Sequence, residues 1–191
     1  MSAPRIVACL GNPGDKYSLT WHNAGFWVAD ILARETGVHF MNAGLFNASV
    51  IPDGPDLIKP NVYMNRSGIS IAAFLDSRGY NSDELLVVCD DINLELGRLR
   101  LRGSGSHGGH NGLRSIIDTL VTEDFPRLRL GIGPAPSGLD LADYVLDTVP
   151  EKLEEEVSVM AHEAADCIML FINEGLAHAQ ERYNRKPVDF D

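Results

Sequence analysis

The sequence predicts an α/β fold in a single domain. Short apolar runs typical of strands alternate along the chain with segments whose apolar residues recur at helical spacing. The 191 residues suffice for one domain with a sizeable core, and no repeat or long linker divides them. We therefore expect residues 1–191 to form one α/β domain, with a frayed tail from about residue 186.

In the first half of the chain, apolar spacing and the glycines or prolines that follow it predict the elements. They are a strand over 5–10, a helix over 23–36 with Gly37 as its C-cap, two strands over 46–51 and 57–59 around the turn 52–55, and a helix over 67–78 that ends at Gly79.

The second half contains three expected strands and two expected helices. The continuous apolar run 85–89 favours a strand buried on both faces, and the alternating segments 98–102 and 127–133 favour half-exposed strands. Asn111 is expected to cap a helix to about residue 121. Thr148 and Glu151 form a capping-box pattern for a long helix that Gly175 ends.

Composition limits the class of protein. The 45% hydrophobic content is ordinary for a globular protein, and no apolar run approaches the roughly 20 residues of a membrane span. The first residues lack the basic and then apolar pattern of a secretory signal. Cys9, Cys89 and Cys167 lie in apolar runs at spacings that match no metal motif, so we expect buried thiols in a reducing cytoplasm.

The net charge of −11 argues against a nucleic-acid partner until its distribution is considered. Residues 131–191 hold thirteen acidic and four basic residues, whereas residues 97–130 hold six arginines and three acidic residues. The acidity is thus mostly a property of the last third. The arginines are compatible either with a solvated strand face or with a basic face that follows phosphates.

Residues 90–112 hold most of the side chains that can do chemistry, and we expect the loop 11–23 to pack beside them. Asp90 and Asp91 end the buried strand, where a carboxylate either forms a turn or holds an imidazole in one tautomer. His22 follows the first strand and its loop, near the strand ends where ligands bind in α/β proteins. It is either a general base for water or a residue that begins a helix.

Asn12, Asn65 and Asn111 each lie beside a break marked by glycine or proline. Their amides can donate to an oxyanion or a water, or serve in turns and caps. The glycine-rich loop 103–109 lacks the ending of a nucleotide-binding loop, so it is either a mobile gate or a simple connection. His107 and His110 match no ligand spacing, so no metal is expected.

Six motifs follow one another across residues 5–185. They are Gly11-Asn12-Pro13-Gly14 with Tyr17, Thr20-x-His22-Asn23-x-Gly25, Lys59-Pro60 with Tyr63-Met64-Asn65-x-Ser67-Gly68, Asp90-Asp91 with Gly97, Gly108-Gly109-His110-Asn111-Gly112-Leu113, and Arg127-Leu128-Arg129-Leu130-Gly131-Ile132-Gly133. In order and approximate spacing they resemble the bacterial-type peptidyl-tRNA hydrolases.

The resemblance implies a mixed, twisted sheet flanked by helices, and an esterase that needs no cofactor. Such an enzyme cleaves the ester between the C-terminal carboxyl of a peptide and the 3′-terminal ribose of tRNA, which releases the peptide and free tRNA. The resemblance further implies a cytoplasmic monomer with no obligate protein partner. Its partner is peptidyl-tRNA, held through the acceptor end of the tRNA.

By the family pattern, His22 activates water, Asp90 keeps it basic and oriented, and Asn12 contacts the peptide. The neutral side-chain amide of Asn12 can hydrogen-bond the amide group of a peptidyl ester. A free aminoacyl ester has a charged, solvated ammonium in place of that amide, and Asn12 would reject it. Six more positions are implied to contact the substrate. These are Asn65 and Asn111 for substrate and water, Tyr17 and Tyr63 for the path of the tRNA end, and Arg100 and Arg102 for tRNA phosphates.

Three features depart from the family pattern. Trp21 stands where an arginine usually precedes the histidine, Asn93 stands where an aspartate is common, and the last third of the chain is acidic. None of the three alters the residues implied in catalysis.

The leading hypothesis is therefore an active peptidyl-tRNA hydrolase. One alternative is an RNA-binding protein on the same scaffold that has lost hydrolysis, which would bind tRNA without cleaving the ester. Another is an esterase for small acylated substrates, whose affinity would respond little to salt because it makes no phosphate contacts.

Overall fold

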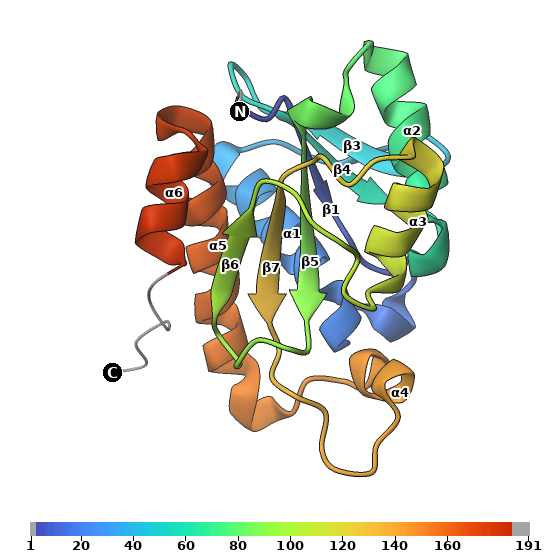
Figure 1. The fold of residues 1–191 in the computed structure, drawn as a ribbon, viewed down its shortest axis with the longest axis vertical. Coiled ribbons are helices and arrows are strands. Elements are labelled where there is room, and N and C mark those ends of the chain that lie inside the picture. Colours follow the sequence, from blue (N-terminus) through green and yellow to red (C-terminus); the bar gives the residue numbers. More distant parts are fainter. Residues whose placement is uncertain (1–2, 185–191) are drawn as a thin grey trace.

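A computed structural model describes residues 3–184 and contains one seven-stranded sheet (Figure 1). In chain order the strands are Ile6–Cys9 (β1), Met41–Asn42 (β2), Phe46–Val50 (β3), Asp56–Pro60 (β4), Leu85–Asp91 (β5), Leu99–Arg102 (β6) and Arg127–Gly131 (β7). The order across the sheet is β2-β3-β4-β1-β5-β7-β6. The tail expected to fray from about residue 186 lies outside the described residues.

The sheet is mixed, as the resemblance implied. β1 pairs in parallel with β4 and β5, and β5 pairs in parallel with β7. The pairs β2–β3, β3–β4 and β6–β7 are antiparallel. All seven residues of β5 are buried, which confirms the strand predicted from its continuous apolar run and extends it to Asp91.

Helices cover both faces of the sheet. They are Ala24–Thr36 (α1), Ser67–Arg78 (α2), Asn111–Leu120 (α3), Leu141–Leu146 (α4), Glu154–Glu174 (α5) and Leu176–Tyr183 (α6). Helices α1 and α5 pack with one face of the central strands in a single core cluster, and α2 and α3 pack on the other face in a second cluster (Figure 1). Helix α4 lies beyond the carboxyl ends of β5 and β7, apart from the sheet (Figure 1).

Three predicted helix ends are confirmed. Gly37 and Gly79 are left-handed C-caps with φ of 69° and 66°, which glycine adopts without strain, and Gly175 ends α5. Two predicted starts are wrong. His110 caps α3 in place of Asn111, which is the first helical residue. Thr148 caps nothing; it forms a β-bridge with Thr20, and α5 begins only at residue 154.

Close packing at Gly25 brings the start of α1 onto the carboxyl ends of β1 and β5. A Cβ atom at Gly25 would lie 2.5 Å from the Leu10 carbonyl oxygen and 2.8 Å from that of Val88. Only glycine permits this approach, because both obstacles are backbone atoms. The residues just before α1, His22 among them, are thereby held at the end of the sheet where Asp90 lies near the end of β5.

The three cysteines are buried, as their apolar runs predicted. Cys9, Cys89 and Cys167 are buried free thiols, and burial raises the pKa of each. No helix within residues 3–184 combines the length and the apolar character needed to cross a membrane.

Candidate active site

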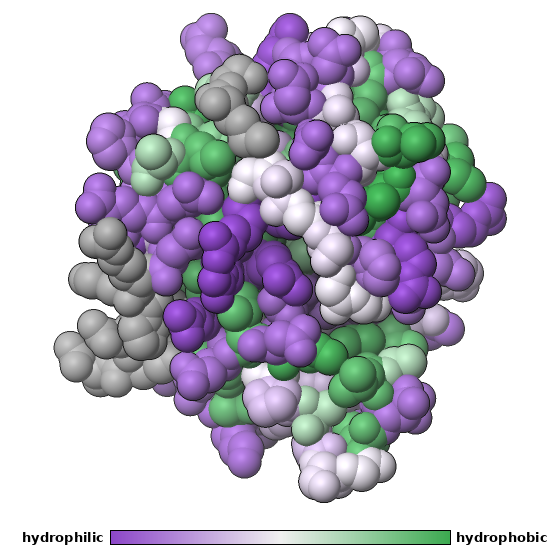
Figure 2. All heavy atoms as spheres, in the orientation of Figure 1, coloured by the Kyte–Doolittle hydropathy of each residue, from purple (hydrophilic) through white to green (hydrophobic). Residues whose placement is uncertain are grey.

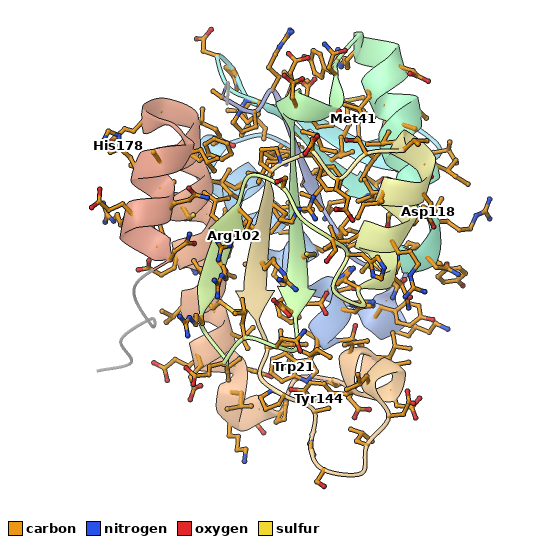
Figure 3. All side chains as sticks on the ribbon, in the orientation of Figure 1. Trp21, Met41, Arg102, Asp118, Tyr144 and His178 are labelled. Atoms are coloured by element: carbon orange, nitrogen blue, oxygen red, sulfur yellow. The ribbon has the colours of Figure 1, made fainter. Side chains whose placement is uncertain are left out.

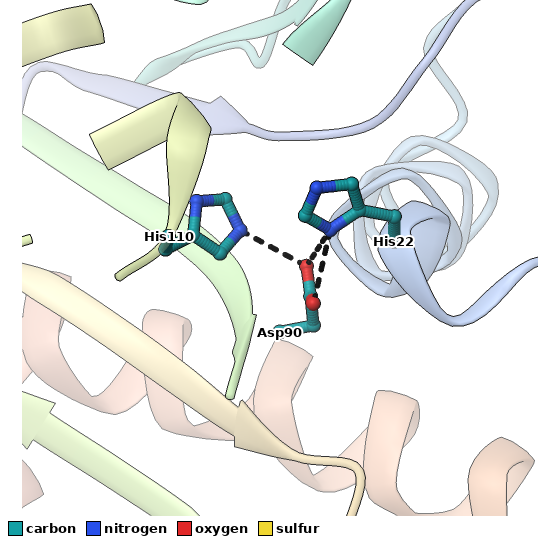
Figure 4. Close-up of side chains that lie close together, drawn as sticks. All are labelled: His22, Asp90 and His110. Atoms are coloured by element: carbon teal, nitrogen blue, oxygen red, sulfur yellow. Dashed lines mark hydrogen bonds and ion pairs between the residues drawn. The ribbon is translucent and has the colours of Figure 1, made fainter. Parts of the chain in front are cut away.

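Two histidines from distant parts of the chain meet on one carboxylate at the end of β5 (Figure 4). His22 lies in a 3-10 turn directly before α1, and its Nδ1 is 2.9 Å from Oδ1 and 3.0 Å from Oδ2 of Asp90. The Nε2 atom of His110 is 3.0 Å from the same Oδ1. The side chains are 8%, 2% and 8% exposed for His22, Asp90 and His110, so water competes little for these bonds.

The hydrogen-bond network assigns a tautomer to each ring. Nδ1 of His110 accepts hydrogen bonds from the backbone N–H groups of Gly112 and Leu113, so Nε2 carries the proton and donates it to Asp90. Nδ1 of His22 donates to the carboxylate, and in this tautomer of the neutral ring the lone pair is on Nε2. An imidazole in this state can accept a proton from water.

Asp90 is held as a carboxylate. Burial alone would raise its pKa, but the positive charge of the His22 and His110 rings, when protonated, and their hydrogen bonds lower the pKa well below its ordinary value. A fixed negative charge in this position stabilises an imidazolium on His22 after proton transfer.

Asn12 is buried and its amide is oriented by backbone contacts. Its Oδ1 accepts a hydrogen bond from the N–H of Met64 at 2.8 Å, and its own N–H donates to Oδ1 of Asn23 at 2.8 Å. The Nδ2 of Asn23 donates in turn to the Asn12 carbonyl. Since Oδ1 is engaged, the Nδ2 group of Asn12 is the free side of the amide; within residues 3–184 it meets no acceptor.

A cleft of about 410 Å³ opens above the histidine–carboxylate cluster. His22, Asp90 and His110 line it, together with the exposed Asn111. Arg129 also lines it and forms an ion pair with Asp91, its Nε 2.9 Å from Oδ2. Ile92 and three residues of α4, Leu141, Ala142 and Val145, supply apolar surface. The cleft therefore contains a base, amide groups and an apolar side within one cavity of small-ligand size.

The comparisons with known proteins agree on one family. The model of the family "Peptidyl-tRNA hydrolase" matches residues 6–190. The chain belongs to this family. It is 44% identical to a peptidyl-tRNA hydrolase of Synechococcus sp. (strain JA-2-3B'a(2-13)), over 97% of this chain and 84% of that protein, and 42% identical to one of Chloroflexus aggregans, over 94% and 98%.

A solved member of the peptidyl-tRNA hydrolase family has the same fold. The crystal structure of the protein from Acinetobacter baumannii matches with a TM-score of 0.91 and 31% identity, over 99% of this chain and 98% of that one. The resemblance read from six short motifs is therefore confirmed, as is the fold that it implied.

Three residues of the family motifs, Tyr17, Tyr63 and Asn65, do not line the cleft that contains the histidine cluster. The rings of Tyr17 and Tyr63 meet edge to face, with centroids 6.3 Å apart, and Tyr63 is 56% exposed. Lys16 places its Nζ 4.6 Å from the Tyr17 ring centroid. Asn65 is exposed in a 3-10 turn next to Met64, the residue that orients Asn12. These residues offer aromatic and amide surface outside the cleft lining.

The arginines have two different environments. In the β6–β7 ladder, Arg100 faces Arg129 and Arg102 faces Arg127. The expectation that all of them share one exposed or basic face is wrong for Arg127, which is buried and donates to the carbonyls of Gly105, Ser106, Glu123 and Phe125. Arg129 is engaged by its ion pair inside the cleft.

Arg100 and Arg102 are the arginines of β6 that remain for an external partner. Arg100 is half-buried and Arg102 is exposed, and neither forms an ion pair within residues 3–184. Figure 3 shows Arg102 at the end of β6 that is farther from Trp21. Neither residue lines the cleft.

The histidine cluster also has the composition of a metal site. One ligand atom each from His22, Asp90 and His110 lie within 4.8 Å of one another. Nitrogen and carboxylate ligands of this kind suit Zn²⁺. Here the network assigns protons to both ring nitrogens that face Asp90, and a metal ion would have to displace them, so the absence of a metal stays a prediction.

Sequence reasoning missed two contacts that build the site. From the sequence, His110 was considered only as a metal ligand, although it caps α3 and donates to Asp90. Asn23 holds Asn12 through two hydrogen bonds. The signal for His110 was its place directly before a helix start, where a side-chain acceptor is wanted. Its second nitrogen then points back toward β5.

Proposed function

We propose that the chain hydrolyses peptidyl-tRNA, with His22 as the general base. The observation that carries the proposal is the buried hydrogen bond between His22 Nδ1 and Asp90 at the cleft, since the neutral ring that donates through Nδ1 has its lone pair on Nε2. The six family motifs and the family membership of the chain support it.

In the proposed reaction, Nε2 of His22 takes a proton from water while the water oxygen forms a bond to the ester carbonyl carbon. The carbonyl electrons move to its oxygen, where amide or backbone N–H donors stabilise the charge. When the tetrahedral intermediate collapses, the bond to the ribose oxygen breaks and that oxygen takes the proton from His22. The products are a peptide with a free carboxyl group and a tRNA with a free hydroxyl. Asp90 stabilises the imidazolium in between.

Asn12 is proposed to distinguish peptidyl from aminoacyl esters. With its Oδ1 fixed on the N–H of Met64, its Nδ2 group presents donors to a peptide carbonyl near the ester. A peptidyl group offers such a carbonyl, whereas a free aminoacyl ester offers an ammonium, which cannot accept a hydrogen bond. Desolvation of the ammonium without a partner would add to the discrimination.

The remaining family positions are proposed to hold the tRNA. Tyr17 and Tyr63 provide aromatic faces on which the unpaired acceptor end can stack. Asn111 at the cleft and Asn65 outside it would position water and substrate. Arg100 and Arg102, which the family pattern assigns to phosphates, are proposed to contact the tRNA backbone. We further propose a cytoplasmic monomer with peptidyl-tRNA as its partner.

The two alternatives have less support. An RNA-binding protein without hydrolysis would not need to keep an oriented base, its buried carboxylate and a fixed Asn12 together. An esterase for small substrates would leave the Tyr17–Tyr63 pair and the arginines of β6 without a purpose.

The test is hydrolysis of N-acetylaminoacyl-tRNA and unblocked aminoacyl-tRNA side by side, with EDTA present. We expect the blocked ester alone to be cleaved. His22→Ala should lower kcat by about 10²–10⁴-fold, as expected for loss of a general base. His178→Ala, which removes an exposed histidine of α6, is the matched control and should leave kcat unchanged. Equal turnover by the His22→Ala variant would remove His22 from the mechanism, and tRNA binding without cleavage would favour the inactive alternative.

A further inference from the structure

The cleft has an apolar side that the proposed chemistry does not use. Ile92 follows β5, and Leu141 and Val145 belong to α4; all three line the same cavity as His22 and Asp90. Several residues that can donate or accept hydrogen bonds lie at the end of β5 and the start of α3, such as Asp90 and Asn111, and the carboxylate of Asp140 lies at the start of α4. An ester bound beside His22 would therefore have aliphatic side chains on one side and hydrogen-bonding groups on the other.

The apolar surface extends out of the cleft along α4. Leu139, Leu141 and Leu146 are 38%, 53% and 43% exposed, and α4 buries none of its residues. Figure 2 shows hydrophobic atoms gathered over this end of the molecule. Exposed apolar surface at the mouth of a cavity is typical of a site that binds an apolar part of a ligand.

The segment that carries the base fixes α4 in place. The rings of Trp21 and Tyr144 are in contact, with centroids 6.0 Å apart, and Figure 3 shows the two side chains side by side. The hydroxyl of Tyr144 donates a hydrogen bond to the Ile132 carbonyl, and the backbone N–H of Trp21 donates one to the Asp147 carbonyl. The residue directly before His22 thus holds the apolar side at a set position relative to the base.

We propose that Ile92, Leu141 and Val145 form a subsite for the side chain of the last amino acid of the peptide, and that this subsite prefers aliphatic side chains. The inference rests on the proposed function and names a substrate preference for it. The carbon next to the ester carbonyl carries that side chain, so the side chain must lie within a few bonds of His22. Asp140, which also lines the cleft, would repel an acidic side chain there.

A nucleobase is a poorer occupant for this surface. Bases bind on aromatic rings or on the planes of arginine side chains, and the lining of this side is aliphatic. The aromatic ring of α4, Tyr144, contacts Trp21. The edge-to-face pair of half-buried Tyr17 and exposed Tyr63 is a better surface for the end of the tRNA.

The test compares N-acetyl-leucyl, N-acetyl-glycyl and N-acetyl-aspartyl esters carried by one and the same tRNA. We expect kcat/KM to fall in the order leucyl, glycyl, aspartyl, with about tenfold between leucyl and glycyl, as a small aliphatic contact allows. Equal kcat/KM for the three esters would overturn the subsite alone. Failure to cleave any of them would overturn the proposed function on which it rests.

Variants locate the preference. Val145→Ser should bring the leucyl-to-glycyl ratio of kcat/KM close to one, and Trp21→Ala should lower it more than Trp21→Phe, which keeps a ring against Tyr144. Val50→Ser, at an exposed valine of β3, is the control and should keep the ratio. Because the ratio is taken on one preparation, a reduced folded fraction cancels. An unchanged leucyl-to-glycyl ratio in Val145→Ser would contradict a side-chain subsite.

Discussion

Asp90 faces Nδ1 of His22 with both of its carboxylate oxygens, at 2.9 and 3.0 Å. An amide at this position could present its NH₂ group to Nδ1, which would then accept, and the ring proton would move to Nε2. His22 would lose the lone pair that the proposed reaction needs. We therefore expect Asp90→Asn to lower kcat by about 10²–10⁴-fold with little change in KM.

The measurement is steady-state hydrolysis of N-acetylaminoacyl-tRNA, with the fold checked by circular dichroism. Asp118→Asn, at an exposed aspartate of α3, makes the same chemical change away from the cleft and should leave kcat unaltered. An Asp90→Asn variant with normal kcat would mean that the tautomer of His22 does not limit the reaction.

The depressed pKa of Asp90 predicts how stability depends on pH. Its folded-state pKa lies below the ordinary value of 3.8, so the unfolded chain takes up the proton first as the pH falls. The unfolded state then binds more protons, and the stability that the carboxylate contributes is lost below about pH 4. Above about pH 5 that contribution is complete and constant.

Urea unfolding of the wild type and Asp90→Asn should therefore differ by a constant free energy at neutral pH. The difference should shrink as the pH falls through 4, since only the wild type loses a stabilising carboxylate. A difference that stays constant from neutral pH to about pH 3 would show that folding does not lower the pKa of Asp90.

His110 joins the stability of α3 to the orientation of Asp90. Its Nδ1 caps the helix, and its Nε2 donates to Asp90. We expect His110→Ala to lose about 1 kcal/mol of unfolding free energy with the cap, and His110→Asn to keep most of it, because asparagine is a good cap. Both variants should lower kcat by about tenfold, since both remove a hydrogen bond to a buried charge.

Chemical denaturation and kcat, measured on the same two variants, separate the functions of His110. If His110→Asn had the kcat and the stability of the wild type, the hydrogen bond to Asp90 would be dispensable and His110 would act only as a helix cap.

Much of the fold follows from local pattern. The left-handed caps at Gly37 and Gly79 and the buried run of β5 were readable because each depends on neighbouring residues alone. The capping box at Thr148 failed for the opposite reason. Thr148 pairs with Thr20, and this contact between distant segments outweighs the local preference of threonine for a cap.

The candidate site was readable where several short motifs had to agree. His22, Asp90 and Asn12 were named from motif order, and the structure brings His22 and Asp90 together. Helix α4 was not predicted, because it is only six residues long and none of them is buried. Its position depends on Trp21, more than a hundred residues earlier in the sequence.

Gly25 should be intolerant of even a methyl group. Alanine normally stabilises a helix relative to glycine by about 1 kcal/mol, but here its Cβ would meet the backbone of Leu10 and Val88. We expect Gly25→Ala to lower the free energy of unfolding by about 1–3 kcal/mol and to reduce kcat, because α1 and the adjacent His22 must move. Gly37→Ala, at the other end of α1 with no atoms in the way, should cost about 1 kcal/mol through its positive φ and leave kcat unchanged.

Urea denaturation of the two glycine variants checks the sign of the effect. A Gly25→Ala protein more stable than the wild type would mean that α1 can withdraw from β1 and β5 without loss.

Arg100 and Arg102 are the last residues whose role depends on a partner outside the chain. Their register neighbours on β7, Arg129 and Arg127, are engaged within the protein, whereas Arg100 and Arg102 remain available for phosphates. Neutralising one phosphate contact on single-stranded RNA should reduce the slope of log affinity against log salt by about 0.7, and one on a duplex by about 0.9. We expect Arg100→Gln and Arg102→Gln each to weaken tRNA binding and to flatten this slope by about that amount.

Fluorescence anisotropy with uncharged tRNA over a range of salt concentrations measures both the affinity and the slope. Arg34→Gln, on α1, removes an arginine hydrogen-bonded to His162 and should leave the slope unchanged. An equal effect of all three substitutions would mean that only net charge matters, and it would remove Arg100 and Arg102 from the tRNA contact.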